Sequence, residues 1–257
     1  MKILAIGDVT SKKGIEHLEK NLWRIRREEN ISFCIVNGEN ASFISSITAE
    51  LADRLFMAGA DAITGGNHTM HQTRDYQYFD DTKAILRPVN FGDCAAGHGF
   101  AILDADGYRI LVINAMGNVH IEPNLDSPFP FIDKILKNEE GKYDFAVLDI
   151  HAEATGEKSA VAYAYDGKIS AVFGTHTHVP TADERILPQG TGYITDVGMC
   201  GEGGGILGMD AESVVVRMRT KLPYKFKAAA GECEANGVVF DIDTSSRKCV
   251  SVKRIKF

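Results

Sequence analysis

The chain has 257 residues, of which 44% are hydrophobic and 25% are charged, and its formal net charge is -7. The apolar fraction is ample for one large core, so we predict a single α/β domain that covers residues 1–257. Electrostatic binding of nucleic acid needs clustered Lys and Arg, which the acidic balance argues against, so we expect no stable nucleic-acid complex. A small anionic substrate is compatible with this charge, because a bound metal ion can supply local positive charge.

The cysteines and the apolar runs indicate the compartment. The five cysteines form an odd set without CxxC spacing, which is typical of free thiols in a reducing cytoplasm (Cys34, Cys94, Cys200, Cys233 and Cys249). The first apolar run ends at Asp8, too early for a signal peptide, and no run approaches the roughly 18 apolar residues of a membrane span. We therefore expect a cytoplasmic protein that has no membrane association.

The N-terminal part alternates between strand-like and helix-like patterns. An apolar run over 3–6 precedes apolar residues at helical spacing, which predict an amphipathic helix over 14–29. A second apolar run, 33–36, precedes a helix that we expect to begin after Thr48 and to stop at Gly59. A third strand, 60–63, is followed by a helix predicted over 72–81. This alternation is typical of an α/β fold.

The middle of the chain adds antiparallel pairing. Asp106-Gly107 lies between apolar runs and predicts a hairpin, so the sheets are expected to be mixed. Residues 117–130 contain three prolines and predict an irregular loop, either a lid or an oligomer contact. After it we expect a helix from about residue 131, strands over 145–150 and 170–173, and a possible hairpin at Asp166-Gly167. Two β-rich segments, 235–243 and 248–257, close the chain.

Polar residues follow five of the predicted strands, at the point where each strand ends. In open α/β sheets ligands bind beyond the carboxyl ends of the strands, so these side chains should converge. The five stretches are Gly7-Asp8, Asn37-Gly38-Glu39-Asn40, Gly66-Asn67-His68, His151, and Gly174-Thr175-His176-Thr177-His178.

Each stretch also has an ordinary structural explanation. Asp8 is either a metal ligand or a helix cap, Asn37-Gly38-Glu39-Asn40 also suits a plain turn, and Asn67 and His68 are ligands or caps. Two histidines at alternate positions after a strand can point the same way, and together with His151 they favour a metal site. Mixed Asp, Glu, Asn and His ligation suits iron, manganese or zinc better than a thiolate-rich structural zinc site.

Three further groups of side chains bear on the site. Cys34 is expected in the core, whereas Cys200 is expected either in the core or in a polar cleft near the site. The remaining histidines are expected to face solvent (His17, His71, His98 and His120). Three cations are expected either to approach a phosphate or to be solvated, as surface Lys and Arg usually are (Lys12, Lys13 and Arg185).

The ordered motifs resemble those of the calcineurin-like metallophosphoesterase superfamily and are most similar to the bacterial YmdB-like phosphodiesterases. The match spans essentially the whole chain, and its supporting stretches include Gly59-Ala60-Asp61 and Gly205-Ile206-Leu207-Gly208-Met209-Asp210. The resemblance implies a metallophosphoesterase-like α/β sandwich, with mixed parallel and antiparallel sheets flanked by helices and a metal site at the C-terminal ends of the strands. It also implies a homo-oligomer.

The resemblance implies a role for each site residue. One metal ion would be held by Asp8, Glu39, Asn40 and His178. The other would be held by Glu39, Asn67, His151 and His176, with Glu39 bridging, and His68 would be a catalytic residue that binds no metal. Iron is the foremost expectation, with manganese or zinc as alternatives. The superfamily usually has Asp-x-His where this chain has Asp8-Val9-Thr10, so Asn40 substitutes for the missing ligand, and loops 10–14 and 42–46 are also atypical.

The expected function is a metal-dependent phosphoric diester hydrolase that acts on 2′,3′-cyclic nucleotides, on 3′,5′-cyclic AMP, or on both, by attack of a metal-bound hydroxide on phosphorus. His68 would stabilise charge or protonate the leaving oxygen. One alternative is a regulatory protein that binds a nucleotide or a protein partner, with incidental turnover. Another is a mononuclear hydrolase of amides or esters, which would hold one metal ion per chain.

Overall fold

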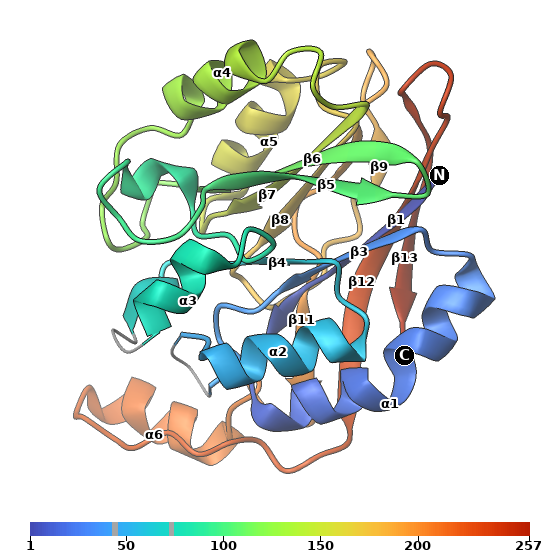
Figure 1. The fold of residues 1–257 in the computed structure, drawn as a ribbon. Helices are drawn as coiled ribbons and strands as arrows, with labels where there is room; N and C mark the ends of the chain where they lie inside the picture. Colours follow the sequence, from blue (N-terminus) through green and yellow to red (C-terminus); the bar gives the residue numbers. More distant parts are fainter. Residues whose placement is uncertain (43–45, 72–74) are drawn as a thin grey trace.

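A computed structural model describes residues 1–42, 46–71 and 75–257 of the chain. Two sheets are stacked face to face and helices cover their outer faces (Figure 1). This is the α/β sandwich with mixed sheets that the sequence predicts.

The first sheet has a parallel centre beside long antiparallel strands. β1, β3 and β4 run parallel, and β12 lies antiparallel against the other side of β1. The order is β2-β11-β12-β1-β3-β4, with β13 paired to β12. The strands are β1 (Lys2–Ile6), β2 (Asp8–Val9), β3 (Phe33–Asn37), β4 (Ala62–Thr64), β11 (Met199–Glu202), β12 (Cys233–Ile242) and β13 (Cys249–Lys256).

The second sheet is parallel at its centre and antiparallel at both edges, in the order β5-β6-β7-β8-β10-β9. Its strands are β5 (Phe100–Ala105), β6 (Tyr108–Met116), β7 (Phe145–His151), β8 (Ala171–Thr175), β9 (Arg185–Ile186) and β10 (Gly192–Ile194). Asp106 and Gly107 join β5 to β6 with φ of 50° and 81°. Two central residues at positive φ are what a tight two-residue hairpin requires, so the predicted hairpin is confirmed.

The first two helices match their predicted ends closely. α1 (Lys12–Glu29) is capped by Ser11, and α2 (Ala49–Ala58) begins after Thr48 and stops at Gly59, whose φ is 117°. The helix predicted over 72–81 is α3 (Tyr76–Asp81), and residues 72–74 of that prediction lie outside the described part. The other helices are α4 (Phe129–Asn138), α5 (Thr155–Ala164) and α6 (Ala211–Thr220), with short 3₁₀ turns at Thr69–His71 and Val89–Phe91.

Alternate residues of each strand supply different layers, because successive side chains of a strand point to opposite faces. In β1, Leu4 and Ile6 pack under α1 and α2, whereas Ile3 and Ala5 face the second sheet. The layer between the sheets includes Phe33, Ile35, Ile110, Val112, Val147, Phe173, Val238 and Phe240. The layer under α4 and α5 includes Leu111, Ile113, Leu148, Ile150, Val172, Ile132, Val161 and Tyr165.

One predicted connection is wrong. Asp166 and Gly167 do not form a hairpin but lie in the turn from α5 to β8, where Asp166 accepts hydrogen bonds from Gln189 N and Thr191 N. β7 and β8 are parallel, and parallel strands need a crossover connection, here the helix α5. An Asp-Gly pair serves such a turn as well as it serves a hairpin.

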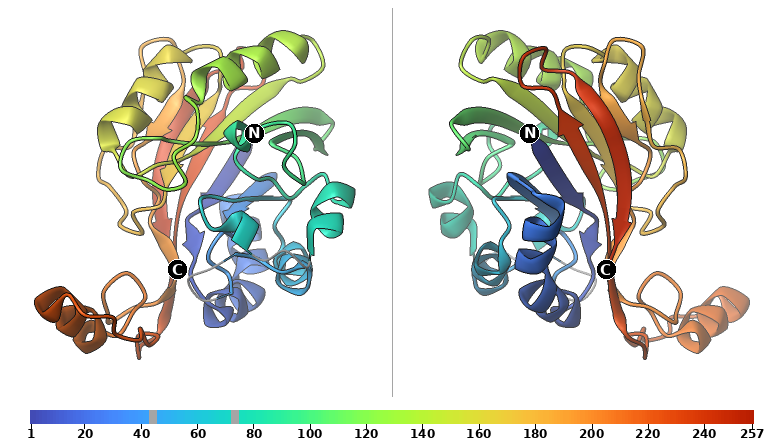
Figure 2. Two further views of the ribbon diagram at one scale, coloured as in Figure 1. Left: turned by 90° about the vertical axis from the view of Figure 1, so that its left-hand side faces the viewer. Right: turned by 90° about the vertical axis from the view of Figure 1, so that its right-hand side faces the viewer.

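Helix α6 lies apart from the rest of the fold, at the end of the molecule away from α4 and α5 (Figure 2). Its buried residues are Ser213 and Val214. No helix in the described part of the chain combines the length and the apolar character that crossing a bilayer requires.

Candidate metal centre

The structure brings the seven predicted ligands together at one end of the two sheets. Asp8 begins β2, His151 is the last residue of β7, and the others follow β3, β4 and β8 directly. In the first sheet β3 and β4 run parallel, as do β7 and β8 in the second, so these strand ends share an edge. Burial is complete for Asp8, Glu39 and His151.

Two groups of candidate ligand atoms share one carboxylate. Glu39, His151 and His176 form one group, and Asp8, Glu39 and His178 form the other. Within each group the ligand atoms lie within 4.8 Å of one another. The resemblance implied the same division, with Glu39 common to both halves.

The first group is closely packed around His151. Its Nε2 lies 3.3 Å from Glu39 Oε2, 3.0 Å from Asn67 Oδ1 and 3.2 Å from His176 Nδ1. Separations near 3 Å are those expected between atoms that share a cation at bond lengths of about 2.1 Å.

The second group contains buried polar atoms that lack a hydrogen bond. Among the described residues, no hydrogen-bond partner is found for Asp8 Oδ1, Asn40 Oδ1 or His178 Nδ1. A buried polar atom without a partner costs about 1–3 kcal/mol, and more when it is charged. Asp8 Oδ1 lies 3.9 Å from His178 Nε2, so a buried carboxylate oxygen without a hydrogen bond faces an imidazole nitrogen, and this pair of donors fits a cation.

Gly66 lies against the same cluster. A Cβ atom at this position would overlap His151 Nε2 and Glu39 Oε2. The backbone after β4 therefore lies in close contact with the candidate ligands. Only a residue without a side chain permits this contact at position 66.

The ionisation states of Glu39 and His176 suit metal ligation. Burial opposes charge on Glu39, but His151 and His68 more than offset it and hold the pKa of Glu39 well below its usual range. Burial, reinforced by the charge of His151, lowers the pKa of His176 to about 3 and leaves its imidazole neutral. Burial raises the pKa of Asp8. Burial lowers the pKa of His151, but Glu39 and Asp8 more than offset this and raise it to about 9, so deprotonation of His151 would accompany metal binding.

A buried polar network lies behind His151. Its Nδ1 is 2.9 Å from Thr175 Oγ1, which donates to Asp149 Oδ1 at 2.7 Å. Asp149 also accepts hydrogen bonds from Thr64 Oγ1 at 2.5 Å and Asn37 Nδ2 at 3.0 Å, and burial raises its pKa to about 6. Outer contacts of this kind fix the orientation of a ligating imidazole. Asp149 was not among the predicted site residues, although an acidic residue within an otherwise apolar strand was a usable indication.

Two of the histidines lie in a strained turn. His176 has φ of 100° and His178 has φ of 64°, a region that residues with side chains rarely adopt. The turn is held through its backbone, because His176 N donates to Asp8 Oδ2 and Thr177 N donates to Asp196 Oδ2, each at 3.1 Å.

His68 and Glu153 lie at the rim of the cluster. His68 N is 3.1 Å from Glu39 Oε2, its Nδ1 is 3.3 Å from Glu39 Oε1, and 27% of its side chain is exposed. Glu153 Oε2 lies 3.2 Å from His176 Nε2 and is half exposed. Both side chains border the candidate ligands and are also accessible to solvent.

Comparison with known proteins identifies the family. The family model described as YmdB-like protein matches residues 4–255. The chain belongs to the YmdB-like family.

Relatives support this assignment over the full length. A 2′,3′-cyclic-nucleotide 2′-phosphodiesterase of Bacillus subtilis (strain 168) is 42% identical over 255 residues, which are 99% of this chain and 96% of that protein. A solved structure of a novel phosphatase from Mycoplasma pneumoniae has a TM-score of 0.93 at 32% identity and covers 100% of this chain and 93% of its own. A hypothetical protein from Thermus thermophilus has a TM-score of 0.92 at 35% identity, with 100% and 99% covered. The predicted metallophosphoesterase-like fold is thereby confirmed.

The two loops predicted to be atypical of the family are described in part. In loop 10–14, Ser11 caps α1 by accepting a hydrogen bond from Gly14 N, and its hydroxyl donates to Glu202 at 2.5 Å. Lys13 lies 3.6 Å from the same carboxylate, and Lys12 is exposed. In loop 42–46, residues 43–45 lie outside the described part.

The idea that Cys200 approaches the site is wrong. Cys200 is fully buried in the core under α1, with its Sγ 3.5 Å from Gly14 O, and burial raises the pKa of its thiol. The prediction for Cys34 is confirmed, since it lies in the same core.

Only some of the histidines that were expected to face solvent do so. His71 and His120 are exposed, but His17 stacks on Phe257 and His98 is half-buried beside Asp80. Arg185 lies over the ring of Tyr193 and 3.5 Å from Asp183.

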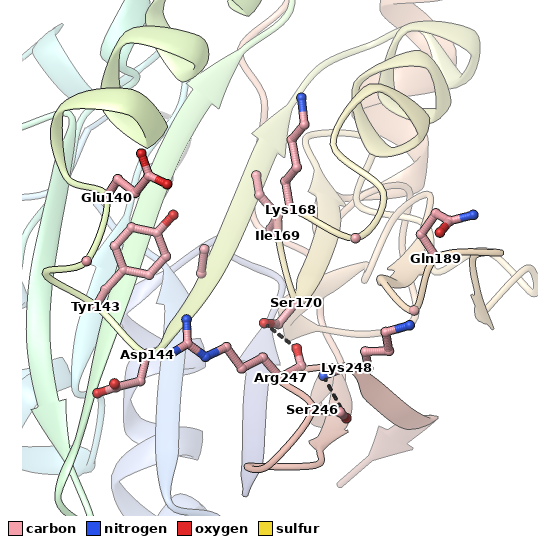
Figure 3. A pocket seen from close by; sticks show the side chains of 14 residues that line it. Glu140, Tyr143, Asp144, Lys168, Ile169, Ser170, Gln189, Ser246, Arg247 and Lys248 are labelled. Atoms are coloured by element: carbon pink, nitrogen blue, oxygen red, sulfur yellow. Dashed lines mark hydrogen bonds between the residues drawn. The ribbon is translucent and has the colours of Figure 1, made fainter.

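A hollow of about 270 Å³ lies at the other end of the second sheet, where β7 and β8 begin. Its three cations, Lys168, Arg247 and Lys248, point away from one another (Figure 3). They therefore do not converge on an anion, and none of the predicted ligands lines this hollow.

Proposed function

We propose that the protein is a metal-dependent phosphodiesterase that hydrolyses 2′,3′-cyclic nucleotides at a two-metal site. The two ligand groups that share Glu39, one of which contains a buried Asp8 oxygen without a hydrogen bond, carry this proposal. The activity named for the Bacillus subtilis relative supports the substrate class. We include 3′,5′-cyclic AMP as a second substrate to be tested.

The ligand assignment is part of the proposal. One cation would be held by Asp8, Glu39, Asn40 and His178, and the other by Glu39, Asn67, His151 and His176. Oxygen and imidazole donors suit iron first, with manganese or zinc as alternatives. When bound, two such cations supply the positive charge that activates a water molecule and neutralises the phosphate oxygens.

The side chains of the protein have separate tasks in this reaction. Glu39 offers its two oxygens to the two ligand groups, and the network from Thr175 to Asp149 holds the ring of His151. Hydrolysis forms one bond from water to phosphorus and breaks the bond from phosphorus to O2′. The leaving oxygen then needs a proton, and His68, at the rim of the cluster, would donate it.

A matched pair of variants tests the proposal. Glu39 and Glu202 are both buried acids, at 0% and 2% exposure, but Glu202 contacts Ser11 and Lys13 rather than the cluster. We expect about two metal ions per wild-type chain by elemental analysis and hydrolysis of 2′,3′-cyclic AMP and bis-p-nitrophenyl phosphate with added Mn²⁺. Glu39→Gln should lose the metal ions and the hydrolytic activity, whereas Glu202→Gln should keep the metal ions and the activity. No metal and no turnover after Mn²⁺ or Fe²⁺ addition to the wild type would contradict the proposal.

Location and assembly complete the proposal. All five cysteines are free thiols, which agrees with a cytoplasmic location. The expected homo-oligomer, with residues 117–130 as its candidate contact, is to be tested by light scattering.

A further inference from the structure

A buried ion pair lies behind the turn that carries two of the candidate ligands. Lys158 Nζ, on α5, is 2.7 Å from Asp196 Oδ2, and both side chains are 0% exposed. Neither residue belongs to the candidate ligand groups. Taking two charges out of water is costly, so a buried pair needs additional hydrogen bonds to be retained.

Asp196 connects this pair to the histidine turn. The oxygen that contacts Lys158, Oδ2, also accepts a hydrogen bond from Thr177 N, and Oδ1 accepts one from Gly198 N at 2.8 Å. Thr177 lies between His176 and His178, both of which have positive φ. Such backbone conformations persist only where the surroundings hold them, and Asp196 supplies that hold at the central residue of the turn.

Lys158 is itself fixed by close packing. A Cβ atom on Gly174, next to the end of β8, would lie 2.7 Å from Lys158 Cδ. The aliphatic stem of the lysine thus lies against the strand that leads into the turn. Its ammonium group has little freedom to leave Asp196, because the whole residue is enclosed.

We propose that Lys158 and Asp196 are positioning residues that hold the turn in its ligating conformation before any metal binds. The turn supplies His176 to one ligand group and His178 to the other, so the pair would act on both. This inference rests on the metal site of the proposed function, but it does not depend on the substrate or on turnover.

Metal binding is the decisive measurement. In chelator-stripped protein, we expect Lys158→Met and Asp196→Asn each to weaken Mn²⁺ binding in calorimetry by about 10- to 100-fold. Val161→Ala is the matched control, because Val161 is fully buried on the same helix and contacts the core rather than the turn. It should lower the unfolding temperature and leave the Mn²⁺ affinity unchanged. Lys168→Met removes an exposed lysine and should change neither quantity.

Hydrogen exchange in the metal-free wild type gives a test that requires no variant. The Thr177 amide should be strongly protected without metal, and Lys158→Met should make it exchange faster. Rapid exchange of this amide in the wild type would overturn the inference even if neither variant folds. So would wild-type Mn²⁺ affinity in both variants. A wild type that binds two Mn²⁺ ions but hydrolyses no phosphodiester would contradict the proposed function and leave this inference intact.

Discussion

His151 Nε2 lies 3.3 Å from Glu39 Oε2, and both side chains are fully buried. Glu39 follows β3 of the first sheet, whereas His151 ends β7 of the second. The contact therefore joins the two sheets at the edge where the candidate ligands gather. A cation between these atoms would fasten one sheet to the other.

Removing the metal should consequently lower stability. At a concentration 100 times its dissociation constant, a ligand of one site stabilises the folded state by about 2.7 kcal/mol. For a protein of this size that corresponds to roughly 5–10 °C in Tm. We expect chelator-treated protein to melt lower by this amount in calorimetry and to recover with Mn²⁺. Equal melting temperatures with and without Mn²⁺ would argue against a metal at this position.

Loss of one histidine of the turn should remove one ion. His176 and His178 belong to different ligand groups, while Glu39 belongs to both. We expect His178→Ala to retain about one Mn²⁺ per chain in elemental analysis, about half of the wild-type content. His120→Ala, at an exposed position, should retain the full content. Full metal content in His178→Ala would remove this residue from the ligand set.

A methyl group at residue 66 should disturb the site. In Gly66→Ala the new Cβ would overlap His151 Nε2 and Glu39 Oε2, so these atoms must move. We expect a loss of metal affinity of at least about tenfold, since ligand geometry sets affinity. Gly156→Ala is the control, because a Cβ there meets nothing within 4 Å. Equal Mn²⁺ affinities in the two variants would show that the close approach at Gly66 is not needed.

Asp183 should make stability depend on pH. Burial opposes its charge, but hydrogen bonds from Thr181 and Thr195 hold its pKa below the usual range. A carboxyl whose pKa is lower in the folded state stabilises the fold above its unfolded pKa, near 3.9, and this contribution is lost as the pH falls. We expect Asp183→Asn to cost about 1–3 kcal/mol at pH 7 by urea unfolding, with the difference from wild type shrinking below about pH 4. A difference that stays constant down to pH 2 would exclude this linkage.

The sequence predicted the positions of the candidate ligands better than it predicted the residues that support them. Apolar runs end at Asn37, Thr64 and His151, and the order of polar residues after them was sufficient to group the site. The support behind His151 joins residues far apart in the chain, such as Asn37 and Asp149, which are 112 positions apart. Such pairings depend on how the two sheets stack, which no local pattern specifies.

For two further residues, the direction or the burial of the side chain in the structure differs from what the sequence indicated. Cys200 follows polar residues, but it pairs with Val9 in the sheet and points into the core under α1. Lys158 lies on a helix, where a lysine is nearly always solvated, so nothing in the sequence indicated its burial.

The central place of β12 has a consequence for how the chain is made. β12 pairs with β1, β11 and β13, and the amino group of Met1 donates to Ile242 O, 241 residues away. Synthesis runs from the N-terminus, so a growing chain carries every candidate ligand before the strand that completes the first sheet exists. Contacts between such distant residues slow folding. We expect the metal centre to assemble only after the final strands have left the ribosome.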